Sequence, residues 1–462
     1  MAVGGNYVLT LAADGGICGW TMMSPSPLDA ILRSALIQKE PSYTKQQHLK
    51  ILAGTWNVSQ ERALCDSLIS WLASPASEAC IVVIGLQEME MGAGFLAMAA
   101  AKETVGIEGS ANGQWWLDTI GKILDEGMTF ERAGSRQLAG LLVAVWVRKD
   151  LCPYIGEVDV GAVACGLGRT IGNKGAVALK MRVFRRILCV INCHFAAHAD
   201  AVARRNADFE YVYRNLTFIP MTAGVNTVAA GVSSAVQRFK NLNVRRGADL
   251  EAEKDIPVAG VASEVLPELA EADMLIWFGD FNYRLDDISY DEARNYIACK
   301  HFDTILRKDQ LRGEMKAGHV FQGMREANIK FPPTYKFDRG QVGLQGYDSS
   351  EKKRVPAWCD RVIFRDSRNG RSTQCKLTCP VVASVIRYDA CMDVKDSDHK
   401  PVRCMFSVDI ACVDERIRRR EFGGLLCFNK EIKTLLEEYN RIPDTIVSTN
   451  NIVLQDYVNL DS

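Results

Sequence analysis

Polar side chains that could bind a metal ion or move a proton stand at the ends of apolar segments along the middle of the sequence. Six segments show this pattern, and the residues involved are Asn57, Glu88, His194, Asp280, Asp360 and the pair Asp398-His399. A single polar residue in such a place is usually a cap or turn residue. Six in the same relation favour one site, because strand ends in α/β sheets deliver their side chains to one rim.

The residue types in this set favour chemistry with a hard metal ion and a phosphate group. Mg²⁺ takes few oxygen ligands from protein and keeps places for water and phosphate, and Glu88 with Asn57 fits that demand. In the stretch IWFGDFNYR, residues two apart share a strand face, so Asp280, Asn282 and Arg284 lie together. Asp280 could deprotonate a water molecule, and Asn282 could hold a phosphoryl oxygen. Zinc is disfavoured, because the sequence has no Cys-x-x-Cys pair.

Two of the six histidines in the chain fall in this set. Asp398 directly precedes His399, which makes it a candidate catalytic residue. Neighbouring residues of a strand face opposite ways, however. We therefore expect a different carboxylate to orient His399, and Asp360 is the leading candidate.

Basic side chains lie near these candidates on glycine-rich or proline-stiffened backbone. Clusters of Lys and Arg are usually solvated surface, but their position here favours a rim that binds several phosphates. The segment GRTIGNKGAVAL (168–179) carries Arg169 and Lys174, FPPTYKFD (331–338) carries Tyr335 and Lys336, and SSEKKRVPAWCDR (349–361) carries Lys352, Lys353, Arg354 and Arg361.

Strands and helices alternate in the part of the chain that carries these residues. The Val-, Ile- and Leu-rich segments are separated by stretches of helical spacing, and this alternation predicts an α/β layered domain. We place the domain at residues 48–408. An insertion at about 221–272 breaks the pattern, and we expect it to be disordered, since loops of that length are disordered or functional.

The two ends of the chain have a different pattern. Residues 1–20 predict two short strands around the Asp14-Gly-Gly turn, a hairpin that needs a partner to be stable. Residues 21–47 predict a polar linker. Residues 409–462 predict a basic helix at DERIRRREFGG, followed by strands and turns. Both ends resemble pieces of larger neighbouring domains.

The composition is that of an ordinary globular protein, with 48% hydrophobic and 24% charged residues among 462. With a net charge of -1, an anionic partner must be met by a local basic patch. The fifteen cysteines are scattered, which favours reduced thiols. The sequence opens without a signal-peptide pattern and has no apolar run long enough to cross a bilayer. We therefore expect a cytoplasmic protein that meets membranes only peripherally.

At these residues the sequence resembles the Mg²⁺-dependent inositol polyphosphate 5-phosphatases. The matching segments are GNKGAVAL, NCHFAAH, WFGDFNYR, FPPTYKF, PAWCDRVIF and SDHKPV, in the order of that family. The resemblance implies an endonuclease/exonuclease/phosphatase-type four-layer sandwich, with two stacked β-sheets flanked by helices. It also implies hydrolysis of the 5-phosphate of phosphoinositides such as phosphatidylinositol 4,5-bisphosphate, or of soluble inositol polyphosphates such as inositol 1,4,5-trisphosphate.

The resemblance also implies roles for individual residues. The metal site for Mg²⁺ comprises Glu88 and Asn57. In the hydrolytic group Asp280 activates the attacking water, and Asp360 orients His399. The scissile phosphate is held by His399, His194 and Asn282. The reader of the neighbouring 4-phosphate comprises Tyr335, Lys336, Lys352 and Arg354.

Weaker resemblances concern the flanks. The segment VLTLAADGGICGW is similar to the end of a WD-type β-propeller blade, as in propeller-bearing plant type II 5-phosphatases, and STNNIVLQ is similar to the first strand of an immunoglobulin-like domain. Partners could bind through such flanking domains, and a phosphoinositide substrate would require transient contact with a membrane surface.

Two alternatives stay open at this point: an endonuclease-type phosphodiesterase of the same fold, or a catalytically silent lipid-binding scaffold. The compact basic segments and the near-neutral net charge favour an inositol phosphate over a nucleic acid. Intact Glu88, Asp280 and His399 argue against a silent scaffold.

Overall fold

The computed structural model describes most of the chain as two compact units. The described residues are 34–90, 109–166, 172–184, 186–221, 268–341, 343–367 and 381–428, with residue 434 and three short strands before residue 22. One unit is Gln47–Ile410, and the other combines Met1–Gln46 with Ala411–Ser462. Arg169, nearly all of the predicted insertion and the predicted immunoglobulin-like start lie outside the described residues.

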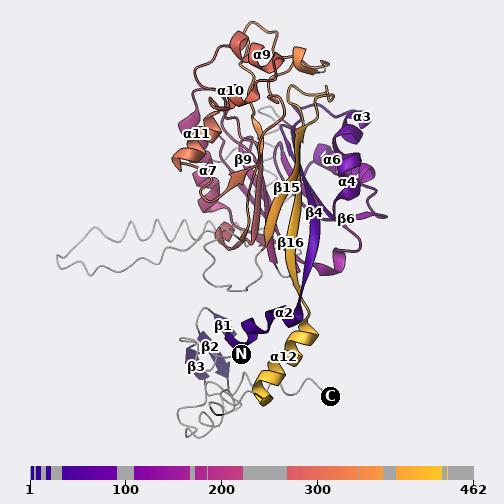
Figure 1. Cartoon of the computed structure of the whole chain (residues 1–462), viewed down its shortest axis with the longest axis vertical. Helices are drawn as coiled ribbons and strands as arrows, with labels where there is room; N and C mark the ends of the chain where they lie inside the picture. The colour runs from indigo at the N-terminus through magenta and orange to yellow at the C-terminus, as the bar shows by residue number, and fades with distance from the viewer. Residues whose placement is uncertain are drawn as a thin grey trace, which may run out of the picture. The chain divides into compact units, whose positions relative to one another are not determined.

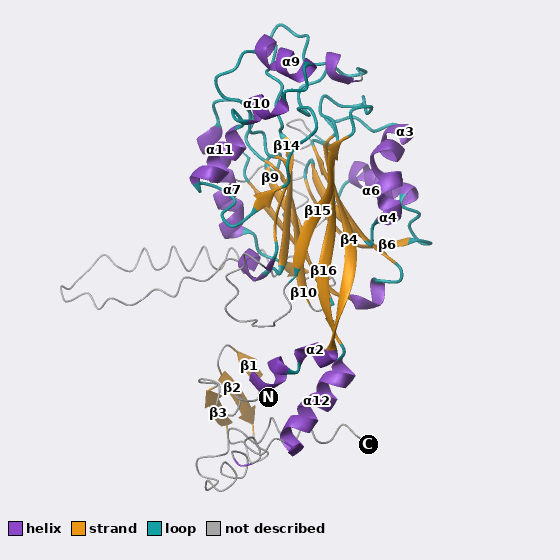
Figure 2. Ribbon diagram, in the orientation of Figure 1, coloured by secondary structure: helices purple, strands orange, loops and turns teal. Residues whose placement is uncertain are grey.

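The unit Gln47–Ile410 is built on two stacked β-sheets (Figures 1 and 2). The seven-stranded sheet contains, in spatial order, β11 (Ile219–Pro220), β8 (Ile155–Ala164), β9 (Gly175–Val183), β10 (Arg186–His194), β12 (Met274–Asp280), β14 (Asp360–Arg365) and β13 (Arg325–Glu326). The six-stranded sheet contains β15 (Val382–Ala390), β16 (Val402–Val413), β4 (Thr44–Asn57), β5 (Ile81–Gln87), β7 (Leu141–Arg148) and β6 (Phe130–Leu138).

Helices cover the outer face of each sheet, which completes four layers (Figure 1). Beside the six-stranded sheet lie α3 (Cys65–Leu68), α4 (Ser74–Glu78) and α6 (Ala111–Ile123). Beside the seven-stranded sheet lie α7 (Val202–Asn215) and α11 (Gln310–Ala317), with α9 (Tyr290–Ala298) and α10 (Phe302–Leu306) near one end. The predicted four-layer sandwich is confirmed.

The sequence explains the layers through continuous apolar runs. The strands β5 and β12 are buried at all seven of their positions, as expected for central strands of mixed sheets that are covered on both faces. On the six-stranded side, Trp56 packs edge-on against Trp71 and Trp116, with ring centroids 5.7 Å and 6.1 Å away. Ser110 precedes helix α6 as its N-cap, and its side chain accepts a hydrogen bond from Gly113 N.

The strand register places the polar strand ends side by side. In the seven-stranded sheet His194 is the partner of Asp280, and Asp280 is the partner of Asp360. In the six-stranded sheet Asn57 is the partner of Gln87, and Glu88 follows at once. These ends form one edge of the sandwich, which we call the strand-end rim.

The unit formed by the two ends of the chain contains a small sheet and a helix pair. The strands β2 (Tyr7–Leu11) and β3 (Ile17–Thr21) form the predicted antiparallel pair, and β1 (Ala2–Gly4) adds a third strand that the sequence did not predict. The predicted basic helix is α12 (Glu415–Phe428).

The segment predicted as a linker contains structure. Helix α2 (Glu40–Tyr43) lies in it, and β4 begins at Thr44, four residues before the predicted start of the domain. Asp414 N donates to Tyr43 O at 2.7 Å, which ties α2 to the approach to α12. Among the described residues, no helix has both the length and the apolar character needed to cross a membrane.

Candidate active site

The predicted strand-end residues meet around a single carboxylate oxygen. Asp280 Oδ2 accepts a hydrogen bond from Asn57 Nδ2 at 3.0 Å and lies 3.4 Å from His194 Nε2 and 3.8 Å from His399 Nε2. Glu88 Oε1 lies 3.6 Å from the same His194 nitrogen. The residues come from both sheets, and the prediction that they gather in one place is confirmed.

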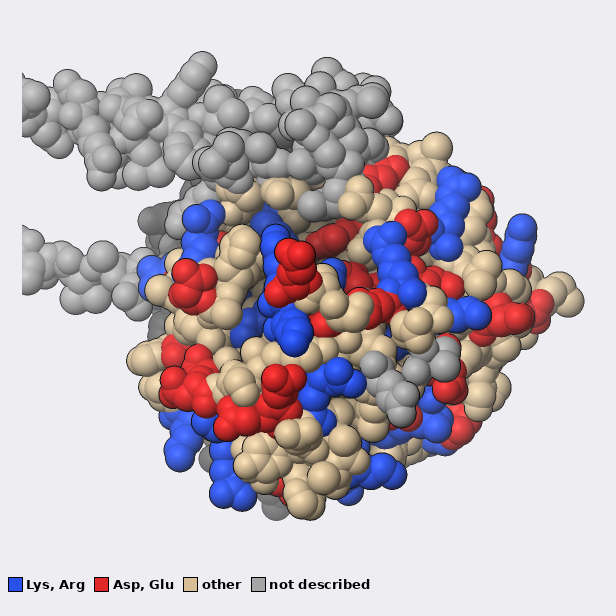
Figure 3. Space-filling view, turned by 90° about the horizontal axis from the view of Figure 1, so that it is seen from above, with Lys and Arg blue, Asp and Glu red and all other residues tan. Residues whose placement is uncertain are grey.

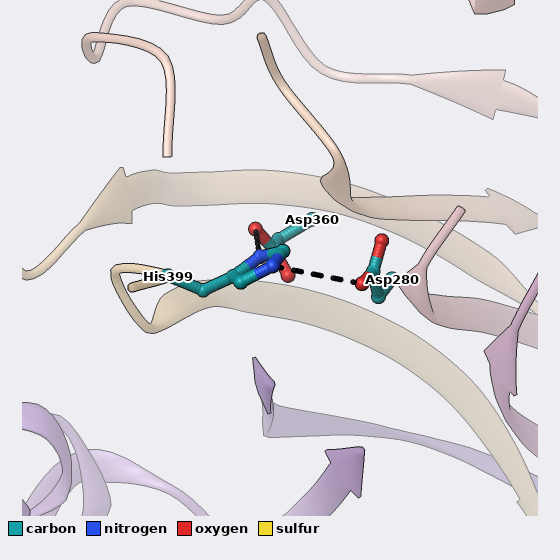
Figure 4. Close-up of side chains that lie close together, drawn as sticks. All are labelled: Asp280, Asp360 and His399. Carbon is teal, nitrogen blue, oxygen red and sulfur yellow. Dashed lines mark hydrogen bonds and ion pairs between the residues drawn. The ribbon is translucent and has the colours of Figure 1, made fainter. Parts of the chain in front are cut away.

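His399 is held as a cation. Its Nδ1 donates to Asp360 Oδ2 at 2.9 Å, as predicted, and the ion pair is drawn in Figure 4. Thr334 Oγ1 donates to the same oxygen at 2.6 Å. Burial opposes protonation of His399, but the charges of Asp360 and Asp280 outweigh it and raise the pKa of the imidazole to about 9.

His194, in contrast to His399, is uncharged. It is buried, and burial together with the charge of Lys174 lowers the pKa of His194 well below its usual value. The imidazole is therefore neutral at physiological pH, and its Nε2 accepts a hydrogen bond from Lys174 Nζ. The site thus offers one cationic and one neutral imidazole beside the same oxygen of Asp280.

Asp280 and Asn282 form a rigid turn at the end of β12. Asn282 N donates to Asp280 Oδ1 at 3.0 Å, and Asn282 has a φ of 58°, which is strained for a side chain other than glycine. Its Nδ2 donates to Phe195 O at 3.0 Å. Burial raises the pKa of Asp280, although the charge of His399 works against the rise.

Arg284 belongs to this turn and was missing from the predicted site residues. Its Nη2 donates to Asn282 Oδ1 at 2.7 Å, and its guanidinium lies 4.1 Å from the ring centroid of Tyr335. The ring of Tyr335 in turn lies 4.6 Å from that of His399. The alternation of Asp280, Asn282 and Arg284 in the sequence was the signal that could have added it.

The donor set at the rim fits a hard cation. Glu88 has a φ of 54°, and its side chain is 25% exposed, so a carboxylate remains open beside Asn57. Asp280, Asp360 and His399 also lie close enough to hold an ion, with ligand atoms within 4.8 Å of one another. Asp360 already forms an ion pair with the protonated His399. We therefore assign these three residues to ionic contacts with each other and not to the metal site. Oxygen ligands from Glu88 and Asn57 match the preference of Mg²⁺.

The predicted phosphate reader forms from two joined loops. Ala357 N donates to Tyr335 O at 2.8 Å, and Asp348 N donates to Lys336 O at 2.9 Å. Lys352 is exposed on the second loop, and Arg354 Nη1 donates to Asp348 Oδ2 at 3.2 Å. The face of the molecule seen in Figure 3 carries Lys and Arg side chains interspersed with Asp and Glu.

Arg361 and Asp398, two of the predicted site residues, lie elsewhere than in the substrate-binding and catalytic positions predicted for them. Arg361 is fully buried between Asp309, at 2.9 Å, and Glu326, at 2.6 Å, so the prediction that it binds substrate is wrong. Asp398 turns away from the hydrolytic group, and its Oδ2 accepts from Lys336 Nζ at 2.5 Å. Its observed partner is thus Lys336 of the predicted phosphate reader.

A two-sheet sandwich with carboxylate, amide and imidazole groups at its strand ends defines a phosphoesterase type of site with oxygen donors that could hold a metal ion. The sequence profile described as Endonuclease/Exonuclease/phosphatase family 2 matches residues 54–405. The chain belongs to this family.

Within this family, the chain is similar to proteins named inositol polyphosphate 5-phosphatases. The chain is 59% identical over 97% of its length to "Type II inositol polyphosphate 5-phosphatase 15" of Arabidopsis thaliana, and 56% identical over 98% to "Type I inositol polyphosphate 5-phosphatase 13" of the same plant. It spans 39% of the length of each of these relatives. The predicted resemblance to the inositol polyphosphate 5-phosphatases is confirmed.

A solved structure shares the fold. The inositol polyphosphate 5-phosphatase domain of SpSynaptojanin, in complex with inositol (1,4)-bisphosphate and calcium ion, superimposes with a TM-score of 0.65 at 25% identity. The match covers 90% of this chain and 99% of that domain.

Proposed function

We propose that the chain is a Mg²⁺-dependent phosphatase that removes the 5-phosphate from phosphoinositides such as phosphatidylinositol 4,5-bisphosphate, from soluble inositol 1,4,5-trisphosphate, or from both. The observation that carries the proposal is the complete group around Asp280 Oδ2 in a chain so similar to proteins named 5-phosphatases. The ligand of the synaptojanin domain also supports it, because inositol (1,4)-bisphosphate is what remains of the trisphosphate once the 5-phosphate is gone.

In the proposed reaction Asp280 is the general base. Its burial favours proton uptake, and a water molecule beside Oδ2 could give up a proton as it attacks the phosphorus in line with the departing oxygen. The cationic His399 lies beside Asp280 and the amino group of Lys174 contacts His194, where both could meet negative charge that develops on the phosphoryl oxygens. Asn282, fixed by two hydrogen bonds, positions the same group.

The metal site would be formed by Glu88 and Asn57. Bound Mg²⁺ would supply positive charge that polarises the phosphoryl group. The strained backbone at Glu88 holds its carboxylate at the end of β5. The preformed position reduces the ordering that metal binding requires.

Recognition of the 4-phosphate falls to the loops that carry Tyr335, Lys336, Lys352 and Arg354. Asp398 fixes the Lys336 ammonium, and Asp348 fixes Arg354, so two of the cations are oriented before substrate arrives. Such a reader is short and compact, which suits a phosphorylated ring better than an extended polynucleotide. We also propose that the protein is cytoplasmic and meets the membrane transiently, and that further partners bind through the flanking propeller-like and immunoglobulin-like regions.

A phosphate-release assay with matched substrates tests the proposal. The chain would be given phosphatidylinositol 4,5-bisphosphate in vesicles, inositol 1,4,5-trisphosphate and a DNA oligonucleotide, each with Mg²⁺ and with chelator. We expect Mg²⁺-dependent phosphate release from at least one inositol substrate, with the 4-phosphate retained in the product by phosphorus NMR. Cleavage of the oligonucleotide alone, or substrate binding without release, would reject the proposal in favour of a nuclease or a scaffold.

A further inference from the structure

Three buried polar side chains meet between the two sheets just beneath the strand-end rim. Thr55 lies on β4, Gln87 ends β5 and Asn192 lies on β10, and each is 0% exposed. Gln87 Nε2 donates to Asn192 Oδ1 at 2.6 Å and to Thr55 Oγ1 at 3.0 Å. The Gln87–Asn192 bond crosses from one sheet to the other, whereas the Gln87–Thr55 bond joins neighbouring strands of the six-stranded sheet.

Asn192 is bonded to the opposite sheet at every polar atom of its side chain. Its Nδ2 donates to Leu86 O at 2.9 Å and to Leu142 O at 2.8 Å, and these two residues are partners in the β5–β7 ladder. Its Oδ1 accepts the bond from Gln87. One residue of the seven-stranded sheet thus joins two strands of the six-stranded sheet.

The backbone opposite Asn192 leaves room for this contact. A Cβ at Gly85 would come within 2.6 Å of Asn192 Cγ and 2.4 Å of the Phe278 ring. Any larger residue at this position of β5 would push the asparagine out of reach of the two carbonyl groups. The glycine therefore permits the close approach on which the bonds depend.

The three residues stand directly behind the proposed active-site residues. Thr55 precedes Asn57 by two positions and Asn192 precedes His194 by two, so each pair shares a strand face. Gln87 immediately precedes Glu88. Each member of the set therefore fixes a strand at the point where that strand delivers a metal-binding or hydrolytic side chain.

We propose that Asn192, Gln87 and Thr55 form an inter-sheet latch that positions Glu88 and Asn57 of one sheet against His194 and Asp280 of the other. Apolar contacts between sheets have no direction. Hydrogen bonds need donor and acceptor at about 3 Å and nearly in line. The three bonds of Asn192, to Gln87, Leu86 and Leu142, therefore limit sliding of one sheet over the other. The latch residues are positioning residues, because none of them touches the group around Asp280 Oδ2.

Metal binding by the free protein tests the latch without relying on catalysis. Mn²⁺ would be titrated into the wild type, Asn192→Leu and Gln87→Met and followed by electron paramagnetic resonance. Both changes keep the approximate size of the side chain. Asn192→Leu removes all three bonds of Asn192 to the other sheet, and Gln87→Met removes the one bond of Gln87 to Asn192. We expect the dissociation constant for Mn²⁺ to rise about tenfold or more, the usual effect of losing a residue that orients metal ligands.

The control is a change of similar cost at the other end of the same strand. Leu188→Ala removes apolar contacts of β10 six residues from His194 and leaves the latch intact. All variants would be assayed well below their melting temperatures. We expect Leu188→Ala to bind Mn²⁺ as the wild type does, even where its melting temperature falls as far as that of Asn192→Leu.

A milder pair keeps the test decisive if Asn192→Leu does not fold. Thr55→Val removes the hydroxyl that accepts from Gln87, whereas Thr55→Ser keeps it. Weakened Mn²⁺ binding in the valine variant with normal binding in the serine variant supports the latch. Equal Mn²⁺ affinity in all latch variants and the wild type would overturn it and leave the three residues as ordinary structural contacts.

Kinetic measurements extend the test, and this part rests on the proposed function. For a functional phosphatase we expect the latch variants to lose about tenfold to a hundredfold in kcat, with KM for inositol 1,4,5-trisphosphate changed less. A wild type that releases no phosphate would refute the proposed function, while the Mn²⁺ titrations would still decide the latch.

Discussion

Asn57 Nδ2 donates to Asp280 Oδ2 at 3.0 Å, and this bond joins the six-stranded sheet to the seven-stranded sheet at the strand-end rim. The same oxygen faces both imidazoles, one neutral and one cationic. The position of Asp280 thus depends on both sheets at once, and a change in either sheet alters the surroundings of the proposed base.

The central role of Asp280 predicts a large kinetic effect at small structural cost. We expect Asp280→Asn to lower kcat for inositol 1,4,5-trisphosphate by about a hundredfold or more, the scale of a lost general base. The melting temperature should hold or rise, because the change removes a charge that burial disfavours. Turnover near that of the wild type in the pure variant would contradict the assignment.

The two site histidines should titrate in opposite directions. Proton NMR of the metal-free protein should show His399 losing its proton near pH 9, because Asp360 and Asp280 stabilise the imidazolium. His194 should stay neutral well below the usual histidine pKa of 6.5, because burial and Lys174 disfavour its charge. His399→Gln and His194→Gln assign the two signals.

The same pKa of His399 has a consequence for stability. The folded-state pKa lies above the usual value of 6.5, so the stabilisation is complete below about pH 6.5 and is lost as the pH rises through 9. Urea unfolding between pH 6 and 10 should show this loss in the wild type and a smaller one in His399→Gln. Parallel stability curves for the two proteins would show that the Asp360–His399 pair does not hold the extra proton.

Much of the site could be predicted because its residues follow apolar strands. Short runs such as VINCH and WFGD mark buried strands by composition, and the polar residue that ends each run must leave the core. Asn57, His194 and Asp280 needed no further information, since strand ends share a rim. The alternation of faces argued against Asp398 as the partner of His399 and left Asp360 as the leading candidate.

The misplaced residues depend on contacts that are distant in sequence. Arg361 was grouped with Arg354 by a continuous basic segment, but β14 begins between them and turns Arg361 into the core. Its partner Asp309 is 52 residues away in the sequence, and the residues next to Arg361 or Asp309 do not indicate that the two form an ion pair. Asn192, in the middle of the apolar run RILCVINCH, likewise shows its function only when the second sheet is present.

The charge of Asp398 should contribute stability above about pH 4 through His399 and Lys336. Burial tends to raise the pKa of Asp398, but His399 and the Lys336 hydrogen bond lower it to about 2, from an ordinary value of 3.8. The contribution is therefore complete above about pH 4 and disappears as the pH falls toward 2, a difference of about 2 kcal/mol at most.

Unfolding of the wild type and of Asp398→Asn between pH 2 and 6 measures that contribution. The curves should converge below pH 3 and separate above pH 4, where only the wild type has the carboxylate. A constant separation across the range would show that Lys336 does not depend on the charge of Asp398. In the variant KM for 4,5-bisphosphate substrates should rise, because the reader loses the group that orients Lys336.

Arg361 and Arg354 should respond differently to the same substitution, although they lie seven residues apart. Arg361→Met leaves Asp309 and Glu326 buried without a cation, so we expect it to cost about 3–5 kcal/mol of unfolding free energy. Arg354→Met removes a partly exposed pair, so its cost should stay below about 1 kcal/mol.

The kinetic outcome should reverse this order. Arg354→Met should raise KM for phosphatidylinositol 4,5-bisphosphate, because Arg354 belongs to the proposed phosphate reader. Arg361→Met, assayed well below its melting temperature, should keep the KM of the wild type. Urea melts and initial rates on both variants measure the two effects separately. A raised KM together with unchanged stability in Arg361→Met would restore the substrate-binding role that the buried ion pairs exclude.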